Sequence, residues 1–290
     1  MEEDTTNTLS LSNNTDIESM TVYSMRLHKK GIKLLQELKY EQALQCHRKA
    51  LFIQETHLVP YHTYIVESIS KIANILHETG NYEEARVLLE RVLKIQENEL
   101  GSNHTKVGII LNNLATLLKD MLYLDEAKVL FERDLSIIKE NEGIHSTEYA
   151  TCLNNIGTIL EDQGHINEAF EYYTKAFEID ELNYSTNLSI TMRNLASSFK
   201  KNNNFDKAYE FYVNAIEIME DILGIKHPYY AILLCDLALL YKEMGDLEKA
   251  KSIYTEALHI QKNIFHDYPN HPNILYTIRS IEYIDTLLLH

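Results

Sequence analysis

Apolar residues return every three or four positions along most of the chain, a spacing that predicts amphipathic helices. Residues 111–135 contain two such runs separated by a short turn, with small residues at Ala115 and, twelve positions later, Ala127. Small residues allow two helix axes to approach closely, and larger residues between them fill the remaining space. The pattern therefore predicts a hairpin of two packed helices.

The hairpin recurs along the sequence. An alanine marks the second helix of each copy, and the copies follow one another at 42 residues, except for one step of 39. The marker alanines are Ala43, Ala85, Ala127, Ala169, Ala208 and Ala250. A hairpin of this kind cannot bury its apolar faces alone, so a fixed period of this size predicts a stack of repeats.

Small and aromatic residues of the fourth copy, namely Gly157, Gly164, Ala169, Tyr173 and Ala176, resemble the tetratricopeptide repeat pattern. The period is longer than the usual repeat of about 34 residues. With the LNNLA sequence at 111–115 and the linker at 223–228, this longer form resembles the kinesin light chains and their relatives. The resemblance covers about residues 21–290. It implies an all-α fold, a right-handed superhelical solenoid of antiparallel helix pairs with a C-terminal capping helix.

The domain organisation follows from the repeat. We expect residues 1–19 to be a disordered acidic tail, because this stretch has five acids, no base and few apolar residues. We expect residues 20–290 to form a single solenoid of six repeats and a capping helix. The predicted repeats are about 20–60, 61–102, 103–144, 145–182, 183–225 and 226–268, followed by the capping helix at 273–289.

Charge and composition narrow the function classes. The net charge of −16 disfavours binding to nucleic acid or to an anionic membrane surface. No run approaches the ~18 apolar residues of a membrane span, and residues 1–19 do not resemble a secretory signal. The three cysteines are far apart, which suits buried thiols in a reducing compartment. We therefore expect a cytoplasmic protein.

No sequence motif of a catalytic, metal or phosphate site is present, so we expect no enzymatic activity, no cofactor and no metal. The acids Asp120, Glu161 and Asp162 lie at the ends of first helices, where we expect them to be solvated. Histidines recur at the linkers between repeats, too far apart to share one metal ion. We expect these histidines to cap the starts of helices: His104, His145, His227 and His271.

Polar residues on the first helix of each repeat are candidates for a binding surface. In stacked hairpins the first helices line the inner face. Those of their side chains that are not needed for packing point toward this face. We predict a peptide-binding groove on this face. Its residues are Lys71, Asn74, Asn112, Asn113, Thr116, Lys119, Asn154, Asn155, Thr158, Arg193, Asn194, Ser197, Lys200, Lys201 and Lys242.

Three of these residues, Asn113, Asn155 and Asn194, form a ladder at one site in successive repeats. An amide carries donors and an acceptor, so it can pair with the backbone of an extended peptide of any sequence. The kinesin light chain resemblance implies that the equivalent asparagines contact a cargo peptide. The alternative is that the ladder hydrogen-bonds neighbouring first helices and holds the repeats in register.

The predicted groove also contains several cations, although the chain as a whole is acidic. These cations favour binding of a segment rich in Asp or Glu. These are Lys119, Arg193, Lys200, Lys201 and Lys242. The leading hypothesis is a non-catalytic scaffold that binds an extended, acidic segment of a protein partner. One alternative is a regulator that encloses a partner enzyme or a signalling peptide, and another is a chaperone adaptor. Residues 1–19 carry no heptad repeat for joining a motor, and the sequence leaves the partner and the oligomeric state open.

Overall fold

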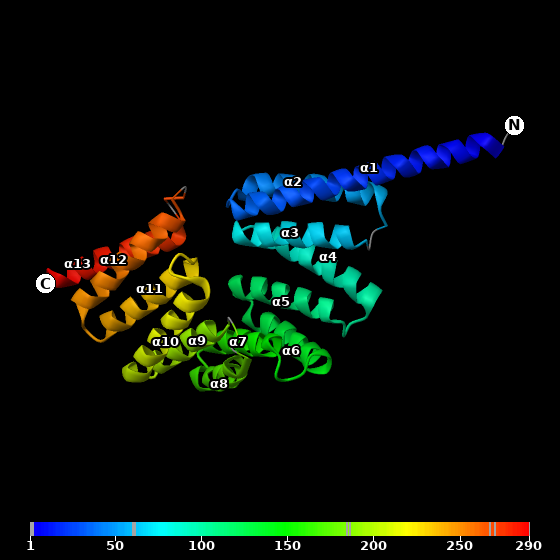
Figure 1. Ribbon diagram of the computed structural model, residues 1–290. Coiled ribbons are helices and arrows are strands. Elements are labelled where there is room, and N and C mark those ends of the chain that lie inside the picture. The colour runs from blue at the N-terminus through cyan, green and yellow to red at the C-terminus, as the bar shows by residue number, and fades with distance from the viewer. Residues whose placement is uncertain are drawn as a thin grey trace. The chain divides into compact units, whose positions relative to one another are not determined.

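The computed structural model describes residues 3–59, 62–183, 185, 187–266, 268–269 and 271–289, with side chains from residue 19 onward. All regular elements in these ranges are helices (Figure 1). They are α1 (Glu3–Gln36), α2 (Tyr40–His57), α3 (Thr63–Glu78), α4 (Tyr82–Leu100), α5 (Thr105–Asp120), α6 (Leu124–Asn141), α7 (Thr147–Asp162), α8 (Ile166–Asn183), α9 (Leu188–Lys201), α10 (Phe205–Leu223), α11 (Pro228–Glu243), α12 (Leu247–Ile264) and α13 (Pro272–Leu288).

Each odd-numbered helix up to α11 packs against the helix that follows it, which gives six hairpins, and α13 packs against α12. We call the two members of a hairpin its first and second helix. The predicted all-α fold of helix pairs is confirmed. The chain divides into two compact units, residues 1–141 (unit 1, α1–α6) and residues 142–290 (unit 2, α7–α13). The single continuous solenoid over 20–290 stays a prediction.

The marker alanines lie where the two helices of a hairpin touch. All six are fully buried, as the sequence predicted. A larger side chain four residues further along each second helix is also buried. In the first and fourth repeats it packs against a glycine of the first helix. In the fourth repeat a Cβ on Gly157 would lie 2.5 Å from the Tyr173 ring, so glycine is needed for this close approach. The small–large alternation of the sequence thus sets the distance between the helices.

The turn inside each hairpin places one residue in the left-handed region, which satisfies the last carbonyl groups of the first helix. Asn203 has φ of 58° at this place, so asparagine takes the position that glycine holds in other repeats. Leu122 has φ of 65° at the equivalent place and is 79% exposed. The third repeat therefore holds a strained leucine that contributes little to the core.

Histidine side chains begin several first helices, as the linkers predicted. In His104, His227 and His271 the ring Nδ1 accepts a hydrogen bond from the backbone N–H two residues later, at 3.1–3.3 Å. The prediction is wrong for His145, because Ser146 caps α7 instead and accepts from the N–H of Tyr149 at 3.2 Å. A serine hydroxyl beside the linker is itself a preferred cap, so it replaces the histidine.

The N-terminal stretch differs from its expectation in one respect. α1 begins at Glu3, so its backbone is helical within the stretch 1–19 that the sequence predicts to be disordered. Side chains before residue 19 lie outside the described residues, and the acidic tail stays a prediction. No described helix is both long and apolar enough to cross a membrane. Cys46, Cys152 and Cys235 are buried, as the sequence predicted.

Candidate functional site

The first helices of unit 2 lie side by side and are joined by a buried polar network. The Asn154 side chain is only 5% exposed, and its amide donates to the Thr191 hydroxyl. Thr191 in turn donates to the Asp180 carboxylate at 2.6 Å, while Asn194 donates to Asn154 at 3.4 Å. Burial raises the pKa of the Asp180 carboxyl. The network ties α7, α8 and α9 together.

One member of the asparagine ladder takes part in this network. Asn194 donates a hydrogen bond to Asn154 of the preceding repeat, which is not itself a ladder residue. Asn154 was grouped with the groove residues, but the structure buries it. Asn155, the next residue, is half-buried, and within the described residues its side chain makes no hydrogen bond. In this part of unit 2 the amide open to a ligand is therefore that of Asn155.

Glu161 at the end of α7 is the second junction of unit 2. Its carboxylate accepts from the Tyr173 hydroxyl at 2.7 Å and from the Ser197 hydroxyl at 3.1 Å, and it pairs with the Lys201 ammonium at 2.5 Å. Burial and the neighbouring carboxylate raise the pKa of the Tyr173 phenol, so it remains a hydrogen-bond donor. The expectation of a solvated acid is wrong for Glu161, since residues of α8 and α9 enclose it.

Three of the predicted groove cations form internal ion pairs, and two of them pair with acids one repeat further along the chain. Arg193 on α9 forms an ion pair with Asp236 on α11, and Lys200 pairs with Glu243 at 3.3 Å. Burial acts to lower the pKa of Arg193, but Asp236 together with Tyr229 and Tyr212 raises it overall, so the guanidinium stays charged. Lys242 lies 5.2 Å from the centre of the Tyr283 ring and makes no ion pair within the described residues.

Unit 1 presents the remaining groove candidates on α3 and α5. Asn74 is exposed, and Lys71, Asn113 and Lys119 are half-buried. The Asn112 amide donates a hydrogen bond of 3.4 Å to the Asp134 carboxylate of its own hairpin. The hydroxyls of Thr116 and Thr158 donate to carbonyls of their own helices, at 2.9 and 2.8 Å, and so are committed to the backbone.

Two polar contacts of unit 1 were not foreseen from the sequence. His77 on α3 contacts the Asp120 carboxylate on α5 at 2.7 Å, which raises the pKa of His77 and lowers that of Asp120. Asp120 is exposed, as expected, and it also contacts His77 of the preceding repeat. Asp134 is buried where most second helices carry alanine or valine, and it fits because Gly108 has no Cβ. In the sequence, Gly108 on the facing helix was the signal that could have predicted the burial of Asp134.

The described residues contain no group of three His, Cys, Asp or Glu side chains that could hold a metal ion. The polar residues of the first helices thus offer hydrogen-bonding and packing groups. In unit 2, internal bonds join α7, α9 and α11, and within the described residues the side chains of Asn155 and Lys242 take no part in these bonds.

The tetratricopeptide repeat model matches residues 63–122, 110–181 and 187–263 of the chain. No curated protein matches the sequence of this chain.

Solved structures resemble the chain over most of its length. Aspartyl phosphate phosphatase F from Bacillus subtilis is 14% identical and has a TM-score of 0.69, covering 96% of this chain and 73% of that one. A Rap protein in complex with Competence and Sporulation Factor is 15% identical with a TM-score of 0.64, covering 92% and 76%. The kinesin light chain repeats of Podosopora anserina are 21% identical with a TM-score of 0.54, covering 68% and 95%. At these identities the likeness concerns the fold alone.

Proposed function

Because the chain belongs to the tetratricopeptide repeat family, we propose that it is a non-catalytic scaffold that binds an extended segment of another protein on its first helices. The observation that carries the proposal is the set of open amides on this face. The side chains of Asn74, Asn113 and Asn155 make no hydrogen bond within the described residues. An amide can donate to and accept from a peptide backbone, so these groups suit a partner of variable sequence.

The preference for an acidic segment rests on few groups. Lys119 and Lys242, one in each unit, make no ion pair within the described residues, whereas Arg193, Lys200 and Lys201 are already paired. In either unit a ligand carboxylate would meet the unpaired ammonium group without displacing an internal acid. The buried cysteines, far apart in the sequence, suit a reducing compartment, and we assign the protein to the cytoplasm.

A second candidate is a regulator that encloses a partner enzyme or a signalling factor. It is favoured by the likeness to a Rap protein solved in complex with Competence and Sporulation Factor, which covers 92% of this chain. The proteins captured from native cell extract distinguish the scaffold from the regulator. A single enzyme or signalling factor indicates the regulator, and several unrelated proteins indicate the scaffold.

The proposal is tested by removing the open amides. We expect Asn113→Ala combined with Asn155→Ala to reduce the amount of protein captured from native cell extract by about tenfold, because two hydrogen bonds to the ligand are lost. Helicity measured by circular dichroism should not change.

The matched control is Asn214→Ala, which removes a half-buried amide from a second helix, α10. It should leave capture unchanged. Equal capture by the double variant and the unaltered protein would count against binding on the first helices.

A further inference from the structure

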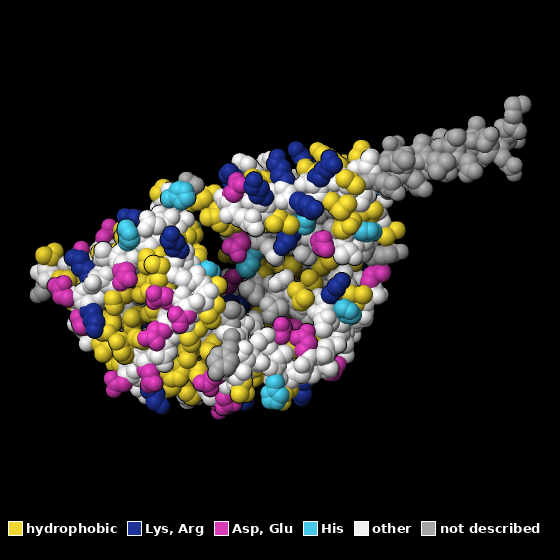
Figure 2. Space-filling view, in the orientation of Figure 1, with side chains coloured by type: hydrophobic (Ala, Val, Ile, Leu, Met, Phe, Trp, Pro, Cys, Tyr) yellow, Lys and Arg dark blue, Asp and Glu magenta, His cyan; other side chains and the backbone are white. Residues whose placement is uncertain are grey.

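The first hairpin differs in charge from the rest of the chain. Residues 21–57 contain seven Lys and Arg against three Glu, although the whole chain carries a net charge of −16. Figure 2 shows Lys and Arg side chains gathered together with hydrophobic ones over α1 and α2. Arg26, Lys29, Lys30 and Lys49 make no ion pair within the described residues. This hairpin therefore presents an uncompensated basic surface.

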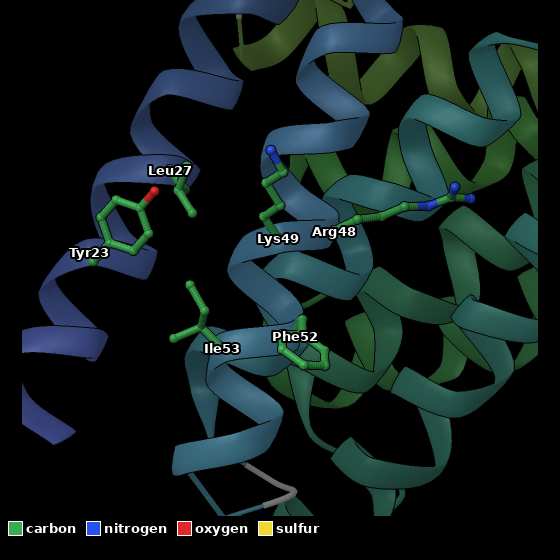
Figure 3. A pocket seen from close by; sticks show the side chains of 6 residues that line it. All are labelled: Tyr23, Leu27, Arg48, Lys49, Phe52 and Ile53. Atoms are coloured by element: carbon green, nitrogen blue, oxygen red, sulfur yellow. The ribbon is translucent and has the colours of Figure 1, made fainter. Parts of the chain in front are cut away.

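A pocket of about 330 Å³ opens on this surface between α1 and α2. Tyr23 and Leu27 of α1 and Phe52 and Ile53 of α2 form its apolar walls, and Lys49 stands at its rim (Figure 3). Arg48 contributes only its stem, since its guanidinium turns away to pair with Glu84 of α4 at 2.6 Å. Phe52 is 72% exposed and Tyr23 52% exposed. Two aromatic rings thus lie open beside a free cation.

Phe52 is not required by the repeat. The same position in the five other second helices holds a small, polar or charged residue, and each is exposed. These residues are Lys94, Ser136, Glu178, Glu217 and His259. A phenylalanine at a position that always faces solvent has no role in packing the hairpin, and an exposed apolar patch of this kind marks an interaction site.

The chain itself shows how such a face is covered in the next repeat. Leu51 of α2 and Leu58, which directly follows α2, pack against a cluster that contains Ile65 and Ile69 of α3. Glu55 of α2 pairs with Arg91 of α4 at 2.7 Å. The covering segment therefore carries apolar residues at i and i+7 and a glutamate at i+4.

The arrangement repeats 42 residues later. Leu93 of α4 packs against a cluster that contains Val107 and Leu111 of α5. Glu97, four residues after Leu93, pairs with Arg133 of α6 at 2.6 Å. Leu100 stands at i+7 in the sequence but is 40% exposed. Two successive second helices of unit 1 thus dock on the following hairpin through a leucine at i and a glutamate at i+4.

The first hairpin carries the same kind of surface as the one on which α2 docks. Tyr23, Leu27 and Lys49 precede Ile65, Ile69 and Arg91 by 42 residues, so they occupy the equivalent positions. Ile65 and Ile69 are fully buried, whereas Tyr23 is half exposed and Lys49 is exposed. Within the described residues no helix covers them.

We propose that this face of α1 and α2 binds an acidic amphipathic helix of another protein. Its apolar residues at i and i+7 would cover Tyr23 and Leu27, and its glutamate at i+4 would pair with Lys49. The nearest match in α13 is Ile281, Asp285 and Leu288, but Asp285 already pairs with Lys251 at 2.6 Å, so a second copy fits less well. A concave pocket with one cation at its rim suits a side chain of a helix better than a flat lipid surface.

The experiment uses a helix-stapled synthetic peptide with the sequence of residues 82–100, which carries the docking pattern at Leu93, Glu97 and Leu100. We expect isothermal titration to show that it binds the full chain at one site. Lys49→Glu should weaken binding by about tenfold, since attraction becomes repulsion. A peptide in which Glu97 is replaced by lysine should recover affinity for that variant. Phe52→Ser should also weaken binding without affecting folding, because Phe52 is mostly exposed.

The control is Lys139→Glu, an equal charge change at an exposed position of α6, which should leave affinity unchanged. The double variant at Asn113 and Asn155 should bind the peptide normally, because this face is separate from the first-helix amides. The proposal is overturned if the peptide does not bind, or if Lys49→Glu has no effect. It is also overturned if sedimentation shows a dimer that Lys49→Glu disrupts, or if vesicles containing phosphatidylserine bind at this face and the peptide does not.

Discussion

Replacing Tyr173 with alanine is expected to lower the free energy of unfolding by about 3–5 kcal/mol. The Tyr173 side chain is fully buried and packs against the bare backbone of Gly157, so truncation leaves a cavity that the rigid helix pair cannot close. The change also removes the hydroxyl that donates to Glu161. Denaturant unfolding followed by circular dichroism measures the effect.

Tyr173→Phe separates the ring from the hydroxyl. Glu161 keeps its bonds to Ser197 and Lys201, so the loss of one donor should cost only about 1–2 kcal/mol. If alanine and phenylalanine at position 173 destabilised the protein equally, packing of the ring on Gly157 would not be what holds this hairpin together.

Acidification from pH 7 to pH 4 is expected to destabilise the first hairpin by up to about 3 kcal/mol through His47. The His47 ring is fully buried between α1 and α2, its nitrogens have no hydrogen-bond partner within the described residues, and the His28 ring lies 4.7 Å away, centre to centre. Burial, with smaller contributions from His28 and from Lys71 on α3, lowers the pKa of His47 to about 4. Glu67 of α3 acts in the opposite sense on His28.

The direction of the effect follows from the lowered pKa. Above its ordinary pKa of 6.5, His47 is neutral in both the folded and the unfolded chain, and it contributes no pH dependence. Below that value the unfolded chain takes up a proton that the folded chain refuses until about pH 4, so stability falls across this window. Amide hydrogen exchange in α1 and α2 at pH 7.0 and 4.5 measures the loss.

His47→Phe is the control, because the equivalent position of the third repeat holds the buried ring of Phe131. Carboxylates titrate alike in both proteins, so the difference in slope reports His47 alone. The variant should lose less protection on acidification. Identical losses in the two proteins would contradict a buried neutral His47.

The helices could be predicted from the sequence because their signals repeat. The marker alanines recur at a fixed period, and each repeat confirms the register of the others. The side chains at the edge of a buried face could not be assigned in the same way. Asn154 and Asn155 are adjacent and chemically identical, yet one is buried in a hydrogen-bond network and the other is open, because a rotation of about 100° separates neighbouring residues on a helix.

The pairing of the cations was missed for a different reason. Arg193 and Asp236 are 43 residues apart, as are Lys200 and Glu243, so each pair joins neighbouring repeats. Their opposite charges at nearly one repeat period were a usable signal. Cations considered on their own helix suggest an acidic ligand, whereas cations considered with the next repeat indicate internal ion pairs.

Site-specific photo-cross-linking tests the proposed binding face most directly. A benzophenone amino acid at Asn74, exposed on the first helix α3, is compared with the same group at Ser136, exposed on the second helix α6. After irradiation in native cell extract, mass spectrometry identifies the attached segments. Binding on the first helices predicts adducts with segments of partner proteins at position 74 and none at position 136. Adducts confined to position 136, or equally abundant at both, would contradict it.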